Sequence, residues 1–315
     1  MRWSELPAAT LLYKADPVRG AEWARLLAER APQIEFRLWP DVGDPAKVRY
    51  LAAWLPPEDL QAFPHLAILF SIGAGIDQFD LAALPPELPL VRMVEPGIAA
   101  GMAEYVTLAV LAIHRHWPAY AAQQRRNEWR ALRVRPASSC RVGVLGLGVL
   151  AQAALAQLVA LGFDCAGWSR SAHDIAGVEC HAGPAALPQF LARCDILVCL
   201  LPLTPDTRGI LDRSLFDALP RGAALVHVGR GGHLVQQDLL DALERGQLAQ
   251  AVLDVCEPEP PPAHHPFFQH PAIVLTPHIA SMTQPETAVE AVLDNLLRHH
   301  HGQPLDGLVE RGRGY

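Results

Sequence analysis

The chain has 315 residues, of which 50% are hydrophobic and 19% are charged. This length is enough for two domains, and the composition allows a large core and argues against disorder. The net charge is −7 without a long run of one sign, which excludes the basic surface that nucleic-acid binding requires. We therefore expect no nucleic-acid partner, and we expect any bound anion to be held by local donors.

The N-terminal residues and the cysteines indicate a protein of the cytoplasm. The first 16 residues, MRWSELPAATLLYKAD, lack the apolar core and cleavage site of a signal peptide. Polar residues such as Gln152 and Gln157 interrupt the apolar regions, so we expect no membrane span. The six cysteines are scattered without a CxxC pair, and we interpret them as buried, reduced thiols.

Short apolar runs alternate with helical patterns through the first hundred residues. A helix is expected at residues 21–30, and strands are expected at 9–15, 34–40, 49–55, 65–71 and 89–95. This alternation is typical of parallel α/β architecture. A long helical pattern follows at 102–117, with an apolar face that this chain or a partner subunit must cover. A polar loop is expected at 123–139.

A second α/β series begins at Cys140. Its strands are expected at 141–146, 164–169, 195–201, 224–229, 251–255 and 272–276. The last amphipathic stretch, residues 285–300, is expected to pack back on the first half. We therefore predict a two-domain α/β chain, with one discontinuous domain (1–99 and 285–315) and one doubly wound Rossmann-type domain (100–284).

The segment VGVLGLGVLAQAALAQL, residues 142–158, is typical of a buried strand, a glycine turn and a helix. Gly146, Gly148 and Ala151 match the G-x-G-x-x-G/A pattern, in which the glycines permit a tight turn and close approach of a pyrophosphate. The phosphates are expected at the helix N-terminus, beside Val149 and Leu150, where N–H groups and the helix dipole attract anions. The alternative is a glycine-rich packing turn.

The end of the next strand indicates which dinucleotide binds. An NAD site usually has an acidic residue about 20 residues after the glycines. Here that place is taken by Ser169, Arg170 and Ser171, whose guanidinium and hydroxyls suit a 2′-phosphate. We expect NADPH to be preferred, with NAD still possible if Arg170 is a solvated turn residue.

Three polar residues follow later strands of the second half. Arg230 lies in HVGRGG, Glu259 in LDVCEPEP and His278 in LTPHIAS. Because loops at the carboxyl ends of parallel strands converge on one crevice, we expect all three on the cofactor side. Arg230 suits the carboxylate of a 2-oxo acid, and His278 suits proton donation to its carbonyl oxygen. Glu259 is expected to pair with His278 and favour the imidazolium.

Five motifs occur along the chain in this order: GLGVLA, LLPLTPDTRGI, HVGRGG, LDVCEPEP and LTPHIAS. On these motifs, the chain resembles the D-isomer-specific 2-hydroxyacid dehydrogenases over nearly its whole length. Within that family, the chain is similar to the glyoxylate/hydroxypyruvate reductases in four further motifs, which are WLPP, IGAGID, WSRS and the C-terminal RGRGY. The resemblance implies that Arg230, Glu259 and His278 are catalytic and that NADPH reduces glyoxylate to glycolate and hydroxypyruvate to D-glycerate. It also implies a homodimer that exchanges the helix after residue 99.

The resemblance assigns further contacts. It implies a flavodoxin-like substrate domain whose residues Ile72, Gly73, Ala74 and Gly75 offer backbone N–H groups to the substrate carboxylate. Trp54 would line the substrate pocket, with ordinary core packing as the alternative, and Met102 would reach it. The implied contacts to the cofactor, besides those named above, are Leu201, Pro202, Thr207, Val228, Gly229, Asp254 (at the nicotinamide amide) and His278.

Several alternatives stay open. A D-lactate, D-glycerate or D-3-phosphoglycerate dehydrogenase would use the same chemistry, but a phosphorylated substrate favours basic residues that the loop SIGAGID lacks; Lys47 and Arg49 are nearby in sequence. A non-catalytic, dinucleotide-sensing regulator would keep the fold, although retention of all three catalytic residue types argues against it. The histidines 299–301 lack a spaced carboxylate or thiol, so we expect no metal site.

Overall fold

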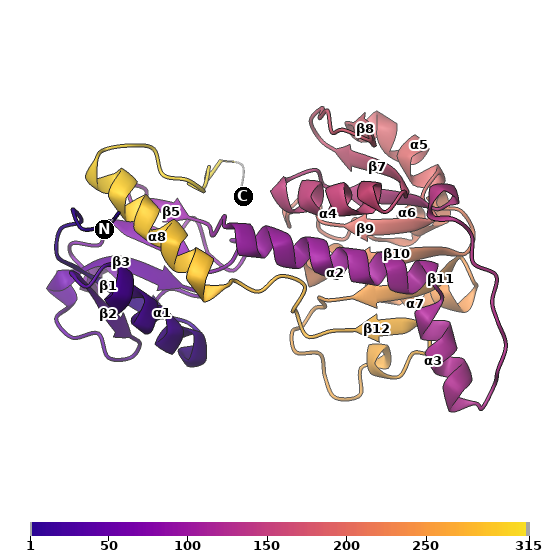
Figure 1. Cartoon of the computed structure of the whole chain (residues 1–315), viewed down its shortest axis with the longest axis horizontal. Helices are drawn as coiled ribbons and strands as arrows, with labels where there is room; N and C mark the ends of the chain where they lie inside the picture. Colours follow the sequence, from indigo (N-terminus) through magenta and orange to yellow (C-terminus); the bar gives the residue numbers. More distant parts are fainter. Residues whose placement is uncertain (1, 313–315) are drawn as a thin grey trace. The chain divides into compact units, whose positions relative to one another are not determined.

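A computed structural model describes residues 2–312 (Figure 1). The chain divides into two compact units, one of Met1–Ile98 with Met282–Tyr315 and one of Ala99–Ser281. Each unit is built on a parallel sheet, so the expected α/β class is confirmed. The division falls within helix α2 (Pro96–His114).

The first unit has the strand order β2-β1-β3-β4-β5, which is the order of flavodoxin-like doubly wound sheets. Its strands are β1 (Ala9–Lys14), β2 (Ile34–Leu38), β3 (Val48–Ala53), β4 (Ile68–Ser71) and β5 (Leu90–Val91). Strands β1, β3 and β4 are almost continuously buried and apolar, as expected for a parallel sheet covered on both faces. The strand expected at 89–95 is shorter than predicted.

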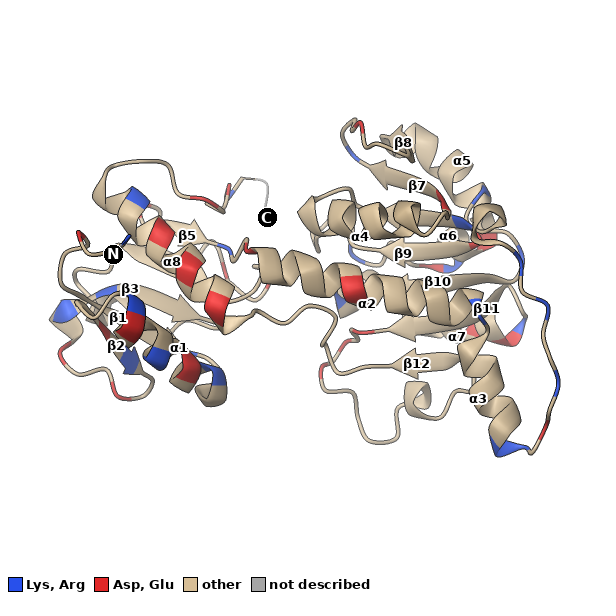
Figure 2. Cartoon of the chain, in the orientation of Figure 1, with Lys and Arg blue, Asp and Glu red and all other residues tan. Residues whose placement is uncertain are grey.

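Helix α8 (Pro285–His300) packs against α1 (Pro17–Arg30) and so brings the C-terminal segment to the first unit. Acidic residues recur every fourth position of α8, at 286, 290 and 294, which places them on one face (Figure 2). Arg30 pairs with Glu290 at 3.1 Å, and the Trp3 indole N–H donates to Asp294 at 2.8 Å. These contacts tie the helix to residues far away in the sequence.

The second unit has the order β12-β11-β10-β9-β6-β7-β8, which is the Rossmann order with one added strand. Its strands are β6 (Arg141–Leu145), β7 (Asp164–Ser169), β8 (Val178–Ala182), β9 (Ile196–Cys199), β10 (Ala223–His227), β11 (Leu248–Leu253) and β12 (Ile273–Leu275). Its other helices are α3 (Trp117–Arg125), α4 (Val149–Ala160), α5 (Leu187–Ala192), α6 (Arg213–Ala218) and α7 (Gln236–Glu244).

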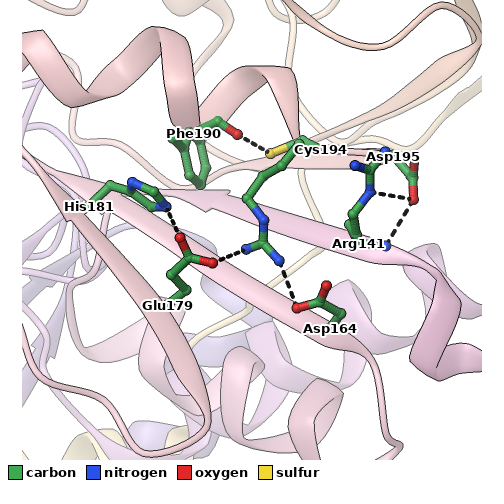
Figure 3. Close-up of polar contacts among 8 residues, drawn as sticks. Arg141, Asp164, Glu179, His181, Phe190, Cys194 and Asp195 are labelled. Carbon is green, nitrogen blue, oxygen red and sulfur yellow. Dashed lines mark hydrogen bonds and ion pairs between the residues drawn. The ribbon is translucent and has the colours of Figure 1, made fainter.

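Strand β8 was not expected from the sequence. It lies at the edge of the sheet and carries Glu179 and His181, which pair at 3.1 Å (Figure 3). Arg193 donates to Asp164 at 2.7 Å and lies 3.5 Å from Glu179, linking the residue after α5 to β7 and β8. The strand pairs with β7 over five residues, but polar residues interrupt its short sequence VECHA, which therefore lacks the apolar run that predicted the other strands.

The helix expected at 102–117 differs at both ends. Helix α2 begins at Pro96, where the buried Glu95 carboxylate accepts from the N–H of Ile98 at 3.0 Å. It ends at His114, and His116 adopts a left-handed conformation (φ 57°) before α3. With 19 residues and a mean hydropathy of 1.6, α2 is long and apolar enough to cross a membrane by length and composition only, so the expectation of no membrane span stays a prediction. The core helices of water-soluble proteins meet the same criterion.

Candidate functional site

The residues expected to act in the second unit share one edge of its sheet. The glycine turn follows β6, Arg170 follows β7, and Leu201 follows β9. Arg230 follows β10, and Glu259 and His278 lie in the segments after β11 and β12. Because every strand pair in this sheet is parallel, all these segments leave the same, carboxyl edge.

The glycine turn has the space that a dinucleotide phosphate needs. Gly146 has a positive φ of 91°, and a Cβ atom there would lie 2.8 Å from the carbonyl oxygen of Leu200. Gly148 is the N-cap of α4, and a Cβ atom there would meet nothing within 4 Å. Ala151 is buried and lets α4 pack on the sheet. Val149 and Leu150 are the first two residues of α4, so their N–H groups have no acceptor within the helix, which fits a pyrophosphate.

The end of β7 forms a tight polar bend. The hydroxyl of the buried Ser169 donates to the carbonyl of Ser171 at 2.6 Å and contacts His173 Nδ1 at 3.0 Å. Arg170 is exposed between the two serines. Ser169 and Ser171 thus shape the bend that carries Arg170. His173, which we did not expect there, also contributes to this bend through its contact with Ser169.

The loop after β9 is closed by one of the residues expected to contact the cofactor. The Thr207 hydroxyl donates to the carbonyl of Pro202 at 2.7 Å and accepts from the Thr204 N–H at 2.8 Å. Leu201 and Val228 are buried. The cofactor contacts of these residues, of Pro202 and of Gly229 stay predictions.

Glu259 and His278 form a pair. His278 Nδ1 lies 2.8 Å from Glu259 Oε2, and Oε1 of the same carboxylate accepts from the Cys256 N–H at 3.0 Å. Burial opposes ionisation of Glu259, but the hydrogen bonds from His278 and Cys256, together with the charges of His278 and Arg230, lower its pKa. An ionised Glu259 therefore orients the imidazole through Nδ1 and leaves Nε2 for another partner.

Asp254 holds the loop that carries His278. The Asp254 carboxylate is buried and accepts from Thr276 Oγ1 at 2.6 Å, from the Ile279 N–H at 2.9 Å and from the Ala280 N–H at 2.7 Å. The Asp254 carbonyl accepts from the His278 N–H at 2.9 Å, and His278 has a positive φ of 54°. This supporting role was missed by the sequence analysis, and the contact to a nicotinamide amide stays a prediction.

The expected substrate loop of the first unit is folded around Ser71. The Ser71 hydroxyl lies 3.0 Å from the Gly75 carbonyl and 3.1 Å from that of Gly73. Within residues 2–312, the N–H groups of Ala74 and Gly75 donate to no protein acceptor. The Trp54 ring packs on Gly73 and is 40% exposed, so the alternative of ordinary core packing is wrong.

Two other features of the second unit do not coincide with these residues. A hollow of about 520 Å³, lined in part by Arg133, Arg135 and Arg221, lies at the amino ends of β9 and β10 and contains no expected cofactor or substrate residue. Cys199, His227 and His233 form a buried cluster beneath the loop of Arg230.

Comparison with known proteins identifies the family. The model for the NAD binding domain of D-isomer specific 2-hydroxyacid dehydrogenases matches residues 107–280. Glyoxylate/hydroxypyruvate reductase A of Serratia proteamaculans (strain 568) is 40% identical over 301 residues, which cover 93% of this chain and 96% of that protein. The protein of the same name from Yersinia enterocolitica is 38% identical, with the same coverage.

Solved structures agree with the sequence relatives. A D-isomer specific 2-hydroxyacid dehydrogenase from Xanthobacter autotrophicus Py2, in complex with NADPH and MES, has a TM-score of 0.92 and 37% identity over 98% of this chain and 100% of that one. An NADPH-dependent glyoxylate/hydroxypyruvate reductase from Sinorhizobium meliloti, with NADP and sulfate, has a TM-score of 0.91 and 36% identity at the same coverage. The chain therefore belongs to the D-isomer specific 2-hydroxyacid dehydrogenase family.

Proposed function

We propose that this protein is an NADPH-dependent reductase of small 2-oxo acids, with glyoxylate and hydroxypyruvate as substrates. The observation that carries the proposal is the 2.8 Å pair of His278 and Glu259, on the sheet edge that also bears Arg230 and the glycine turn. The named activity of the relatives from Serratia and Yersinia supports the same choice of substrates.

The side chains suit distinct parts of the reaction. Bound NADPH supplies the hydride that reaches the carbonyl carbon. The Arg230 guanidinium binds the carboxylate next to that carbon and polarises the carbonyl group. His278 donates a proton from Nε2 to the carbonyl oxygen, so that the alcohol forms without a free alkoxide. Glu259 holds the imidazole by Nδ1 and stabilises its protonated form before the transfer.

The first unit contributes donors for a carboxylate. The N–H groups of Ala74 and Gly75 have no protein acceptor within the described chain, and Trp54 presents an exposed ring beside them. Adjacent free N–H groups in a turn form an anion-binding nest. We infer that residues 72–75 and Trp54 bind the substrate.

The coenzyme preference is assigned to the bend after β7. Arg170 lies on the exposed side of the bend that Ser169 and Ser171 shape. A guanidinium there stabilises the 2′-phosphate of NADPH, and NADH lacks that group. Changing Arg170 to alanine should lower kcat/KM for NADPH by about 10- to 100-fold, while leaving that for NADH nearly unchanged. An equal loss for both coenzymes would contradict the assignment.

The activity is tested by following nicotinamide absorbance with glyoxylate or hydroxypyruvate, with NADPH and NADH in parallel. We expect much faster oxidation of NADPH. Faster oxidation of NADH would keep the chemistry but reject the 2′-phosphate site. Turnover of larger or phosphorylated 2-oxo acids alone would indicate a D-lactate or D-3-phosphoglycerate type of dehydrogenase. A protein that binds the cofactor but turns over no substrate, and whose cofactor binding is unchanged in His278→Gln, would be a dinucleotide-sensing regulator.

We also infer a homodimer in the cytoplasm. Helix α2 carries Glu104 and no other Asp, Glu, Lys or Arg (Figure 2), and Leu108 on it is 67% exposed. Trp117 and Trp129 farther along are also exposed. A second copy of the chain would cover this apolar surface. The free cysteines fit a reducing compartment. Light scattering after size exclusion tests the dimer, and Leu108→Glu should shift it toward monomer.

A further inference from the structure

We propose that His227 and His233 are positioning residues that hold the main chain of Arg230 from both sides. Neither residue belongs to the catalytic set proposed above, and the inference rests on the proposed role of Arg230. Both side chains are completely buried, at the end of β10 and just after the Arg230 loop. They therefore act on the substrate only through the backbone that carries the guanidinium.

The two imidazoles pair with both polar groups of the Arg230 backbone. His227 Nε2 lies 2.9 Å from the Arg230 carbonyl oxygen, and the Arg230 N–H donates to His233 Nδ1 at 3.0 Å. His233 Nε2 in turn lies 3.2 Å from the carbonyl oxygen of Pro202. The chain of contacts connects the Arg230 loop to the loop after β9, on the same edge of the sheet.

These contacts determine which ring nitrogen carries the proton. His233 Nδ1 also lies 3.0 Å from the Arg230 carbonyl oxygen, but the Arg230 N–H needs an acceptor, so Nδ1 is unprotonated and Nε2–H donates to Pro202. His227 Nε2 donates to the Arg230 carbonyl, and its buried Nδ1 has no partner in the described chain. Burial lowers the pKa of His227 to about 3, so this ring is neutral. The ring of His233 is neutral because its Nδ1 accepts the Arg230 N–H and therefore carries no proton.

The glycines of the loop make this arrangement possible. A Cβ atom at Gly229 would lie 2.9 Å from His233 Nδ1, so a larger residue there would push the imidazole away from the Arg230 N–H. A Cβ atom at Gly231 would lie 2.0 Å from the carbonyl oxygen of Cys256, whose N–H donates to Glu259. The Arg230 backbone is thus fixed between the histidines and the segment that leads to Glu259.

The same cluster has the composition of a metal site, because ligand atoms of Cys199, His227 and His233 lie within 4.8 Å of one another. However, both nitrogens of His233 and one of His227 already pair with backbone groups. A metal would have to displace those bonds and leave the N–H of Arg230 without its acceptor, while the Arg230 carbonyl would keep only the backbone N–H of His233 at 3.0 Å. The geometry therefore favours the positioning role.

Substitution of His227 and His233 by asparagine or glutamine distinguishes a role in positioning Arg230 from a role in merely filling the core. An asparagine side chain places its oxygen near the position of Nδ1, and a glutamine side chain places its amide nitrogen near the position of Nε2. His227→Gln and His233→Asn therefore keep the bonds to Arg230, and His227→Asn and His233→Gln lose them. We expect the second pair to lose about 10- to 100-fold in kcat/KM for the oxo acid, with NADPH affinity unchanged, and the first pair to stay within about 3-fold of wild type.

A purely structural role predicts a different pattern. It would penalise the smaller asparagine at both positions, in parallel with thermal stability, and that result would overturn the inference. If Arg230→Gln is inactive while all four histidine variants remain active, the positioning role fails and the proposed function stands. If Arg230→Gln retains full activity, the proposed function fails.

Two measurements on the unaltered protein keep the test independent of whether variants fold. Nitrogen-15 NMR of the imidazoles should show both His227 and His233 as neutral Nε2–H tautomers at neutral pH. An Nδ1–H tautomer at His233, or a charged ring at either position, would overturn the inference. Metal analysis of the purified protein should show no stoichiometric zinc, and one zinc ion per chain that is lost in Cys199→Ser would also overturn it.

Discussion

Substitution of Gly231 by alanine tests how closely the Arg230 loop must pack on the segment before Glu259. The added Cβ atom would lie 2.0 Å from the Cys256 carbonyl oxygen, 2.1 Å from its carbon and 2.7 Å from the Glu257 nitrogen. All three are backbone atoms and cannot rotate away. Relief to an ordinary contact of about 3.4 Å requires the two segments to separate by about 1.4 Å.

A separation of that size should move Arg230 relative to Glu259 and its partner histidine. A displacement of about 1 Å in a positioned catalytic group can cost roughly 100-fold in rate, so we expect a loss of that order in kcat/KM. Overpacking should also lower the free energy of unfolding by about 1–3 kcal/mol. Steady-state kinetics with NADPH and an oxo acid, together with urea unfolding, measure both effects.

The neighbouring Gly232 supplies the matched control. A Cβ atom there would meet the guanidinium of Arg208 at 2.9 Å, which is the end of an exposed, flexible side chain that can move aside. Gly232→Ala should therefore stay within a few-fold of wild type in kcat/KM. Equal activity of the two alanine variants, whether both high or both low, would refute the argument from backbone contact.

Three further outcomes follow from the charged and titrating groups. Glu259→Gln should lower kcat by about 100-fold with little change in NADPH affinity, and unchanged kcat would contradict its role beside the histidine. Asp254→Ala leaves the N–H groups of Ile279 and Ala280 without their acceptor and should cost about 3 kcal/mol in urea unfolding, along with activity. His227 has a pKa of about 3 in the folded protein and about 6.5 in the unfolded chain. Between these two pH values, the imidazole is therefore protonated in the unfolded chain but not in the folded protein. Stability should therefore fall as pH drops below about 6.5, by about 2 kcal/mol at pH 5, and His227→Gln should remove this part of the pH dependence; an identical pH profile in the variant would contradict it.

Sequence periodicity was enough to predict the fold class and most strands. The buried strands β1, β3 and β4, and β6, β9 and β10, are continuous apolar runs, which the sequence shows directly. Strand β8 was missed because it lies at the sheet edge and polar residues alternate with Val178 and Cys180 along it, so it lacks the continuous apolar run of the central strands. The start of α2 was missed because the cap that begins it, Glu95, precedes the apolar pattern.

The chemistry of the candidate site was readable because its residues follow strands. Arg230, Glu259 and His278 each stand in a segment that leaves the carboxyl edge, so a parallel sheet brings their segments to one edge whatever the packing. The 2.8 Å contact of Glu259 and His278 depends additionally on the Cys256 N–H and on the left-handed conformation of His278, which no residue pattern predicts.

The two histidines around Arg230 form a sequence pattern that could have predicted their contacts to the Arg230 backbone. They stand three residues before and three residues after the arginine, in the pattern H-x-x-R-x-x-H. A strand that ends at the first histidine and a turn of 3₁₀-helix that ends at the second bring both rings beneath the residue between them. A buried neutral histidine can pair with a backbone N–H or a backbone carbonyl, whereas a buried lysine or arginine can pair only with the carbonyl. The pattern is therefore suited to holding both polar groups of one residue without adding a charge beside its guanidinium, which agrees with the anionic substrate that we propose for Arg230.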